Sequence, residues 1–352
     1  MEPLLHHQPV PRNKQRGALK AGRKGAAAVL ALTALLIALG SVALLSGSVS
    51  IPPGVIVRIL LGQEGNSPLA RIIWEFRLPR IVMALLAGMM LSAGGTISQA
   101  VFRNPLADPY IIGVSAGAVA GAVFAFLLKL PDFYYGLFSF FSASGTAFLV
   151  SRFSLRRGRA DTSLLLIIGV AVSAFLSALT SFGMYLTGQD SYRIVIWTMG
   201  YLGSATWGRI ALLLVPFALG MVYFLYHRHD IDALLLDDEE AHSLGLDVGR
   251  LKRGLLLAVS LMAAFSVAFT GMIGFVGLIV PHAMRALTGA SHSRLIPLAA
   301  YAGAVFLLFA DILARTLIAP VEIPIGVVTA IFGAPLFLSL AVHSRKGEAL
   351  EY

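Results

Sequence analysis

The chain has no cysteine among its 352 residues. Disulfides, thiolate metal sites and cysteine nucleophiles are therefore excluded. Charged residues are also scarce, at 13% of the chain, which is about half of the share usual in soluble domains. Hydrophobic residues reach 57% and the mean hydropathy is +0.82. This balance argues against an ordinary soluble protein and indicates a chain surrounded largely by lipid.

The sequence also lacks the residues of several energy-converting sites. It has no Gly-Lys dipeptide, hence no P-loop, so any ATP must be hydrolysed by another chain. No pair of carboxylates in the apolar segments forms an obvious ion relay, since the nearest candidates, Asp311 and Glu322, fall near external ends. No His-rich pattern accompanies His282, which fits a hydrogen-bonded helix-end residue better than a metal ligand. We expect no catalytic residue, no metal site and no covalently bound cofactor.

Ten apolar segments recur along the chain and predict an all-α polytopic membrane protein with about ten transmembrane helices. They are Gly25–Leu45, Leu78–Val101, Ile112–Leu128, Tyr135–Phe153, Ser163–Leu186, Ile210–Tyr226, Leu255–Phe269, Gly274–Ala286, Leu295–Leu313 and Ile325–Val342. The segment Ile51–Phe76 is expected outside the membrane. The segment 188–208 is too short to span and return, so we expect a half-helix at the external interface, with Trp197 and Trp207 as belt aromatics.

Polar ends flank one predicted membrane domain. Residues 1–24 form a basic tail, residues 25–345 the membrane domain and residues 346–352 a second short tail. The basic tail followed by an apolar run resembles a signal peptide. However, Gly25–Leu45 is long enough to span a bilayer and only a weak cleavage site follows it, so we predict an uncleaved first helix.

The net charge of +9 fits the orientation of a membrane protein better than nucleic-acid binding. Most of the 27 Lys and Arg residues fall in the tail and in connections on the same side of the predicted helices, which follows the positive-inside rule. An even number of spans places both termini on one side. We therefore expect both termini in the cytoplasm and no nucleic-acid partner.

Three arginines run against this charge bias. Arg77 and Arg80, at the start of the second apolar segment, and Arg315, after the ninth, are expected on the external side. One interpretation is that they reach lipid headgroups, or that Arg315 pairs with Asp311 one helical turn before it. The other is a basic external surface that docks an acidic partner by charge complementarity. The sequence alone leaves both open.

The sequence Arg103-Asn104-Pro105-Leu106-Ala107-Asp108-Pro109 interrupts the helices between the second and third apolar segments. Its two prolines, four residues apart, forbid a continuous helix. Irregular backbone at membrane depth must be satisfied by protein or water, and it often lines a cavity or gate. A plain interhelical turn is the alternative.

A polar insert at about 230–250 is the only long hydrophilic segment after the tail. Its acidic run, Asp237 to Glu240, favours the first turn of a short helix, and Gly245 suits the end of that helix. Ala241 and Leu244 would share one face. Such a helix between two membrane spans is typical of a docking element for a cytoplasmic partner, and a solvated loop is the alternative.

Four long segments, in this order and spacing, closely resemble the FecCD-type permeases, which include cobalamin, haem and ferric-siderophore importers. The matching text is RLPRIVMALLAGMMLSAGGTISQAVFRNPLADPYIIGVSAGA (Arg77–Ala118), DDEEAHSLGLDVGRLK (Asp237–Lys252), GFVGLIVPHAMR (Gly274–Arg285) and ADILARTLIAPVEIPIGVVTAIFGAPLF (Ala310–Phe337). The resemblance extends from about Arg77 to the C-terminus. The N-terminal tail and the segment Ile51–Phe76 are less diagnostic.

The resemblance implies a cobalamin-permease-like fold of the type II ABC importers, in the bacterial inner membrane. It implies a homodimer with the translocation path along its twofold axis. Two copies of a separate ATPase, which binds ATP and Mg, would dock on the cytoplasmic side. An extracytoplasmic binding protein would dock on the other. The transported chelate is not fixed among cobalamin, haem and a ferric siderophore.

The same resemblance implies roles for individual residues. Arg77, Arg80 and Arg315 resemble the arginines that receive acidic residues of the binding protein. Asn104 and Leu106 resemble cytoplasmic gate residues, and Thr162 resembles a second gate position, although Ala160-Asp161-Thr162 matches loosely. The residues that resemble the ATPase-coupling helices are Asp237, Asp238, Glu239, Glu240, Ala241, His242, Ser243, Leu244, Gly245 and Leu246.

Two other classes of function are compatible with a polytopic chain. A secondary transporter, driven by a proton or sodium gradient, requires an essential carboxylate within the membrane and no partner ATPase. A membrane-embedded enzyme requires a buried catalytic constellation, and the sequence contains none that we can identify. Dependence of transport on a partner ATPase separates the importer from both.

Overall fold

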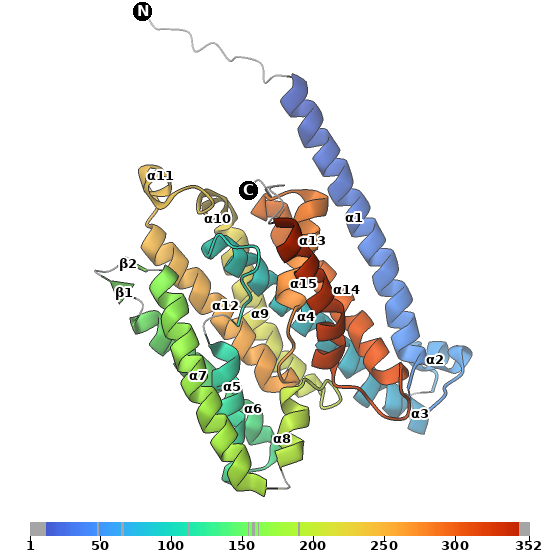
Figure 1. Ribbon diagram of the computed structural model, residues 1–352. Coiled ribbons are helices and arrows are strands. Elements are labelled where there is room, and N and C mark those ends of the chain that lie inside the picture. Colours follow the sequence, from blue (N-terminus) through green and yellow to red (C-terminus); the bar gives the residue numbers. More distant parts are fainter. Residues whose placement is uncertain are drawn as a thin grey trace, which may run out of the picture.

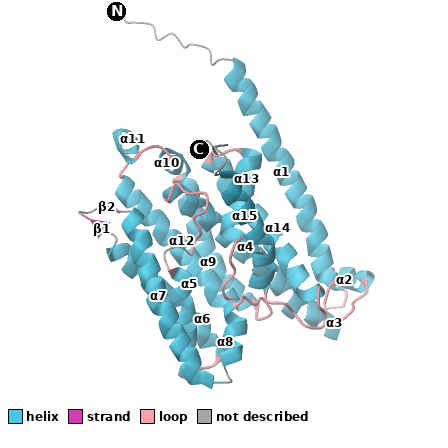
Figure 2. Ribbon diagram, in the orientation of Figure 1, coloured by secondary structure: helices cyan, strands magenta, loops and turns pink. Residues whose placement is uncertain are grey.

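The computed structural model describes residues 12–47, 49–64, 67–110, 113–153, 155–156, 159–160, 162–188 and 191–344. Figures 1 and 2 show that this part of the chain is a bundle of helices with one small hairpin. The first helices are α1 (Arg12–Leu45), α2 (Pro53–Leu60), α3 (Pro68–Arg71), the π-helix η1 (Ile72–Arg77), α4 (Leu78–Val101), α5 (Val114–Leu127) and α6 (Asp132–Phe153). The hairpin pairs β1 (Leu155–Arg156) with β2 (Arg159–Ala160). The remaining helices are α7 (Thr162–Thr187), α8 (Ser191–Thr198), α9 (Trp207–Tyr226), α10 (Arg228–Ala233), α11 (Asp238–Ser243), α12 (Val248–Thr270), α13 (Val276–Thr288), α14 (His292–Thr316) and α15 (Ile325–Ser344).

Each of the ten predicted transmembrane segments corresponds to a helix. Seven helices of the described part are long and apolar enough to cross a membrane, and three shorter apolar ones occupy the positions of the third, eighth and tenth predicted spans. The half-helix expected in the segment 188–208 is α8. The all-α membrane fold is therefore confirmed.

Several predicted boundaries were wrong, and the local sequence explains two of them. The first helix begins at Arg12 rather than Gly25, because Lys, Arg, Gln and Ala are good helix formers beyond the bilayer. The seventh begins at Val248 rather than Leu255. Here the Asp247 side chain accepts a hydrogen bond from the Arg250 amide at 3.0 Å and caps the new start.

The second predicted span also begins earlier than expected, because α3, η1 and α4 form one continuous helical segment from Pro68 to Val101. Within it, Pro79 has no N–H to donate, and the preceding backbone widens into the π-helix. In the π-helical pattern the amide of residue 79 would donate to the Trp74 carbonyl, and proline leaves that carbonyl without a donor. The Trp207 indole instead donates to that carbonyl at 2.8 Å.

Helix α4 is the centre of the bundle and is buried along most of its length. It crosses α14 where Gly88 meets Gly303, and it crosses α13 where Gly95 meets Gly277. A Cβ atom added at Gly95 would lie 1.8 Å from the Gly277 carbonyl oxygen. In lipid, such close backbone approach is a main source of helix association.

The two ends of the bundle carry different elements. Helices α10 and α11 lie at the same end as the N-terminal end of α1, and α2, α3 and α8 lie at the opposite end (Figure 1). The insert expected in the cytoplasm and the half-helix expected at the external interface are thus at opposite ends, as the predicted topology requires. We name these ends by the predicted orientation, as the cytoplasmic and the external end.

Candidate functional sites at the two ends of the bundle

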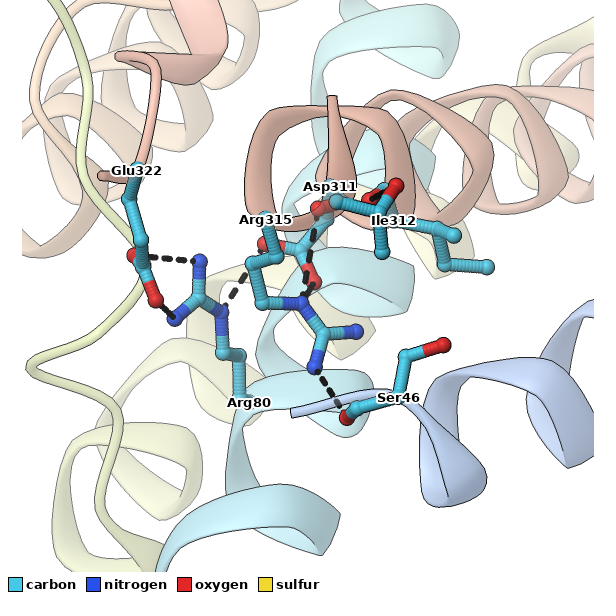
Figure 3. Close-up of polar contacts among 7 residues, drawn as sticks. Ser46, Arg80, Asp311, Ile312, Arg315 and Glu322 are labelled. Atoms are coloured by element: carbon cyan, nitrogen blue, oxygen red, sulfur yellow. Dashed lines mark hydrogen bonds and ion pairs between the residues drawn. The ribbon is translucent and has the colours of Figure 1, made fainter. Parts of the chain in front are cut away.

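Arg80 joins three segments at the external end. Its Nε lies 2.9 Å from Asp311 Oδ1 on α14, and its Nη1 and Nη2 donate to the two carboxylate oxygens of Glu322 at 2.9 and 3.0 Å. Figure 3 shows the Arg80 guanidinium between the two acids. Arg80 is largely buried, whereas 38% of the Glu322 side chain is exposed. The cluster therefore has an inner acid and an outer acid.

Arg315 completes the inner part of this cluster. Its Nε lies 3.1 Å from Asp311 Oδ2 on the same helix, so the pair expected from helical spacing is present. Its Nη1 donates to the Ser46 carbonyl, just beyond the end of α1, at 3.2 Å (Figure 3). Asp311 is fully buried between the two arginines. A buried carboxylate flanked by two guanidinium groups is held in one orientation.

Arg77 is buried and bound to the end of α1. Its guanidinium donates to the carbonyls of Leu44 and Val49, and more weakly to that of Leu45 at 3.4 Å. The last carbonyls of a helix carry partial negative charge and lack intrahelical donors, so a cation is favoured there. Arg77 thus ties α1 to the start of α4.

The structure therefore brings the three predicted docking arginines together but gives each of them partners within the chain. Glu322 is the outermost charged group that binds them. From the sequence, Glu322 is only a carboxylate near the external end. The available signal was an acidic residue three residues before the tenth apolar segment, at the end where the three anomalous arginines were expected.

At the cytoplasmic end, the turn after α4 is built by side-chain acceptors. Asn104 Oδ1 accepts from the Leu106 amide at 2.9 Å, and Asp108 Oδ1 accepts from the Tyr110 amide at 2.8 Å. These two Asx turns satisfy amides that the prolines keep out of a helix. Asn104 is exposed and Leu106 is partly exposed, so both predicted gate residues lie at the surface of a single chain. Thr162 is the first residue of α7, and its side chain lies outside the described part.

Arg103 connects this turn to the polar insert. It adopts a left-handed conformation, with φ of 47°, which is uncommon for a residue with a side chain. Its Nε donates to the Leu234 carbonyl after α10 at 2.7 Å, and its Nη2 pairs with Asp238 at the start of α11. Lys252 Nζ on α12 lies 3.0 Å from both Asp238 carboxylate oxygens. Asp238 therefore joins three segments.

Asp238 and Lys252 differ in their exposure to water. Only 6% of the Lys252 side chain is exposed, against 53% of Asp238. Burial opposes the charged form of Asp238, but hydrogen bonding and charge from Lys252, together with Arg103, lower its pKa below the ordinary value. The Asp238 carboxylate is thus ionised at neutral pH.

The predicted short helix in the insert is α11, and Gly245 ends it as expected. Gly245 has φ of 84°; its amide donates to the His242 carbonyl at 2.9 Å and the Leu246 amide to the Ala241 carbonyl at 3.3 Å. This is a Schellman motif. The expected shared face was wrong: Ala241 is buried, whereas Leu244 follows the helix as its C-cap and is exposed.

The acidic residues of the insert separate in the same way. Asp237 is 89% exposed, and Glu239 and Glu240 are exposed on α11. With Leu244 they form an outward surface of three acids and one apolar side chain. Asp237 has one distant partner, Arg103 Nη1 at 3.7 Å, whereas Asp238 is bound closely by both Arg103 and Lys252. Asp238 cannot be told from its neighbours in the sequence, because its partners Lys252 and Arg103 lie 14 and 135 residues away along the chain.

A second internal link of the insert was not predicted. Asp232 on α10 accepts from the His292 amide at 2.8 Å and lies 2.6 Å from His292 Nδ1. It thereby caps the start of α14, which begins three residues before the predicted Leu295. The capping acid comes from another helix rather than from the preceding residue, so no local pattern reveals it.

The external end also has a cavity of about 220 Å³ between α6, α8, α9 and α12. Tyr135, Trp197, Tyr201 and Phe269 line it together with Arg209. Arg209 Nη1 donates to the Ser204 carbonyl at 2.8 Å. Trp197, predicted as a belt aromatic, thus faces this cavity, whereas the Trp207 indole binds Trp74. Among the described residues, no cluster of metal-ligating side chains occurs.

Comparison with known proteins identifies extensive similarity. The sequence model of the FecCD transport family matches residues 35–343. The chain is 41% identical to the cobalamin import system permease protein of Halobacterium salinarum, over 79% of this chain and 75% of that protein. It is 38% identical to the hemin transport system permease protein of Yersinia pestis, over 82% of this chain and 88% of that protein.

The fold has a counterpart among solved structures. It superposes with a TM-score of 0.79 and 33% identity on a metal-chelate type ABC transporter in an inward-facing conformation. The match covers 89% of this chain and 98% of that one. Similarity in sequence and in structure therefore extends over most of the chain rather than over isolated motifs.

Proposed function

The chain belongs to the FecCD transport family, and from this membership we propose that it is the membrane-spanning permease of an ATP-driven importer. Its cargo is an iron-siderophore, haem or cobalamin-type chelate, which it carries into the cytoplasm. The observation that carries the proposal is similarity over most of the chain to permeases named for cobalamin and hemin. A metal ion within the chelate is cargo and not a cofactor of the chain.

The subunit works as a homodimer with two ATPase chains and one extracytoplasmic binding protein. Two features support this assembly. The sequence has no P-loop of its own, so the work must come from ATP and Mg bound by another chain. In addition, α7 and α9 carry rows of exposed large apolar side chains, such as Ile167, Val170, Leu219 and Val222. Such faces are covered by lipid or by a second membrane subunit.

The orientation follows from the same assembly. The ATPase binds at the end that holds α10 and α11, where Glu239, Glu240 and Leu244 are exposed. That end is the cytoplasmic one, and both termini lie in the cytoplasm of an inner-membrane protein. The binding protein docks at the external end, near the arginine cluster.

Transport proceeds by alternating access, without covalent chemistry on this chain. ATP closes the ATPase dimer, and the insert moves with it. The turn that holds Asn104 and Leu106, together with the start of α7 at Thr162, opens or closes the cytoplasmic side. ATP can drive this change only through its different affinities for the two states.

Reconstitution tests the proposal directly. The chain is inserted into proteoliposomes with and without its ATPase, and uptake of labelled cobalamin, haem and a ferric siderophore is measured. We expect uptake of one of these only with the ATPase, ATP and the binding protein. Uptake that follows a proton or sodium gradient in the absence of ATP would reject the importer. The buried Asp311 supports the importer, because two arginines already bind it and it is not free to relay ions.

A further inference from the structure

The outer edge of Arg80 already holds a carboxylate in the geometry that a docking partner would use. Nη1 and Nη2 each donate to one oxygen of Glu322, at 2.9 and 3.0 Å. Two parallel N–H···O bonds are the arrangement a guanidinium offers to any carboxylate. An acidic side chain from another protein cannot form these two bonds while Glu322 occupies them.

The inner edge of Arg80 does not depend on Glu322. Its Nε pairs with Asp311 at 2.9 Å, and Asp311 is itself held by Arg315 at 3.1 Å. Because this inner contact is buried, the Arg80 guanidinium keeps its direction when its outer bonds are broken (Figure 3). The two Nη donors would then face outward as a preformed site.

Glu322 can leave this position without unfolding its loop. Its side chain is partly exposed, so the released carboxylate can enter water. The loop is held by its neighbours: the Ile323 amide donates to the Ala314 carbonyl at 2.9 Å, and the Val321 amide to the Ile318 carbonyl at 3.0 Å. Only a side-chain rotation is needed.

The other two arginines are not exchangeable in this way. Arg77 binds the carbonyls of Leu44 and Val49, and Arg315 binds the Ser46 carbonyl and Asp311. These acceptors are backbone atoms or a fully buried acid, and they cannot turn away to solvent. Arg77 and Arg315 therefore hold α1 in place.

We propose that Glu322 is an exchangeable occupant of Arg80, which the binding protein must displace with an acidic side chain of its own. This inference rests on the proposed function, because the partner is the binding protein of the importer. Docking is then an exchange of one carboxylate for another rather than the capture of a free cation. Such an exchange keeps affinity moderate and favours a partner whose acid is aligned with both Nη donors.

The test is a binding titration with Glu322→Gln, using the binding protein that supports transport by the wild-type chain. The amide keeps the shape of the side chain but loses its charge. We expect the Kd to fall by about tenfold, since a charge-assisted bidentate competitor has been removed. Glu322→Asp, which is one methylene shorter and keeps the charge, should give a smaller decrease.

Glu75→Gln is the matched control. Glu75 pairs with Arg71 at 3.4 Å on the same external end, and both side chains are well exposed. The substitution changes the net charge equally but does not free Arg80, so we expect a change in Kd of less than about twofold, as for a surface pair. The melting temperatures of the variants in detergent should match that of the wild-type chain.

Three results would overturn the inference. The first is weaker binding or unfolding of Glu322→Gln, which would make Glu322 a structural support of Arg80. The second is an unchanged Kd of Glu322→Gln. The third is an equal gain in affinity in Glu75→Gln, which would indicate a general effect of charge. Failure of the proposed function is a different result: the wild-type chain would then bind no binding protein and transport without one.

Discussion

Replacing Asp238 by Asn separates two roles that the acidic insert could have. Asp238 is less exposed than Asp237, at 53% against 89%, and it holds both Lys252 and Arg103. If the insert moves the cytoplasmic turn during transport, this link carries the movement. Arg103 is the first residue of that turn, two residues after the end of α4, and it is bound to Asp238. Asp238→Asn should therefore leave ATPase binding intact and impair coupling.

The magnitude follows from the exposure of the partners. Removing one member of a fully buried ion pair costs about 3 to 5 kcal/mol, because the other charge is left without a partner. Asp238 is 53% exposed and Lys252 only 6%, so water partly replaces the lost acid and we expect about 1 to 2 kcal/mol. This lowers the population of the linked state by about 5- to 30-fold.

The same exposures predict an asymmetry. Lys252→Met leaves Asp238 half in water and still paired with Arg103, so it should destabilise the chain less than Asp238→Asn, which leaves a buried cation. The double variant should resemble Lys252→Met. Melting temperatures in detergent measure this order.

Because the chain has no cysteine, single cysteines in α11 and in the turn also allow the two segments to be labelled and their separation to be followed.

The functional assay is ATP hydrolysis and uptake measured together in proteoliposomes. Asp238→Asn should hydrolyse ATP at a rate near that of the wild-type chain but transport about tenfold less substrate per ATP. Asp237→Asn is the control, since Asp237 is 89% exposed and its distance to Arg103 is 3.7 Å. Normal transport per ATP in Asp238→Asn, or an equal loss in Asp237→Asn, would refute the reasoning.

Other substitutions test the packing and the pH response. Gly95→Ala would place its Cβ 1.8 Å from the Gly277 carbonyl, so we expect a loss of about 3 kcal/mol in thermal unfolding; Gly145→Ala, in open space on α6, should stabilise by about 0.5 kcal/mol. Asp232→Ala removes the cap of α14 and should cost about 1 kcal/mol. Burial opposes ionisation of Asp232, but hydrogen bonds from His292 prevail and lower its pKa below 3.8. An acid with a lowered pKa stabilises the fold above its unfolded pKa and loses that effect as the pH falls through the folded pKa. The melting difference between the wild-type chain and Asp232→Ala should therefore shrink as the pH falls below about pH 4; a difference that stays the same between about pH 5 and about pH 3 would contradict this assignment.

Features that depend on neighbouring residues were predictable from the sequence. Hydropathy located ten helices, because lipid requires long apolar segments with satisfied backbones. The Gly245 stop of α11 and the Asp311–Arg315 pair follow from helix geometry within a single turn. These predictions need no knowledge of how the helices are arranged.

The partners of the isolated charges were not predictable in this way. Arg80 is 231 residues from Asp311 and 242 from Glu322 along the chain. The orientation bias marked Arg80 as anomalous but did not say what binds it. A charge that is anomalous in the sequence can bind a partner protein or a residue of its own chain. Only the packing of α4 against α14 shows which group each edge of the Arg80 guanidinium binds.

The two ion-pair networks meet on one helix. Arg80 lies in the first turn of α4 at the external end, and Arg103 follows its last turn at the cytoplasmic end. Between them α4 runs for about 36 Å, mostly buried and crossed closely by α13 and α14. A buried helix fixed by backbone contacts moves as a unit, so a displacement at Arg103 reaches Arg80.

Coupling between the two ends through α4 must be shown by measured affinities, and it predicts a reciprocal effect. If nucleotide binding changes the affinity for the binding protein, the binding protein must change the affinity for nucleotide by the same factor. Asp238→Asn should reduce both effects equally while leaving the Kd for the binding protein without nucleotide unchanged. Titrations of the wild-type and variant complexes, with and without a non-hydrolysable ATP analogue, measure the two factors. If Asp238→Asn preserves the factor of the wild-type complex, the coupling between the two ends does not pass through this link.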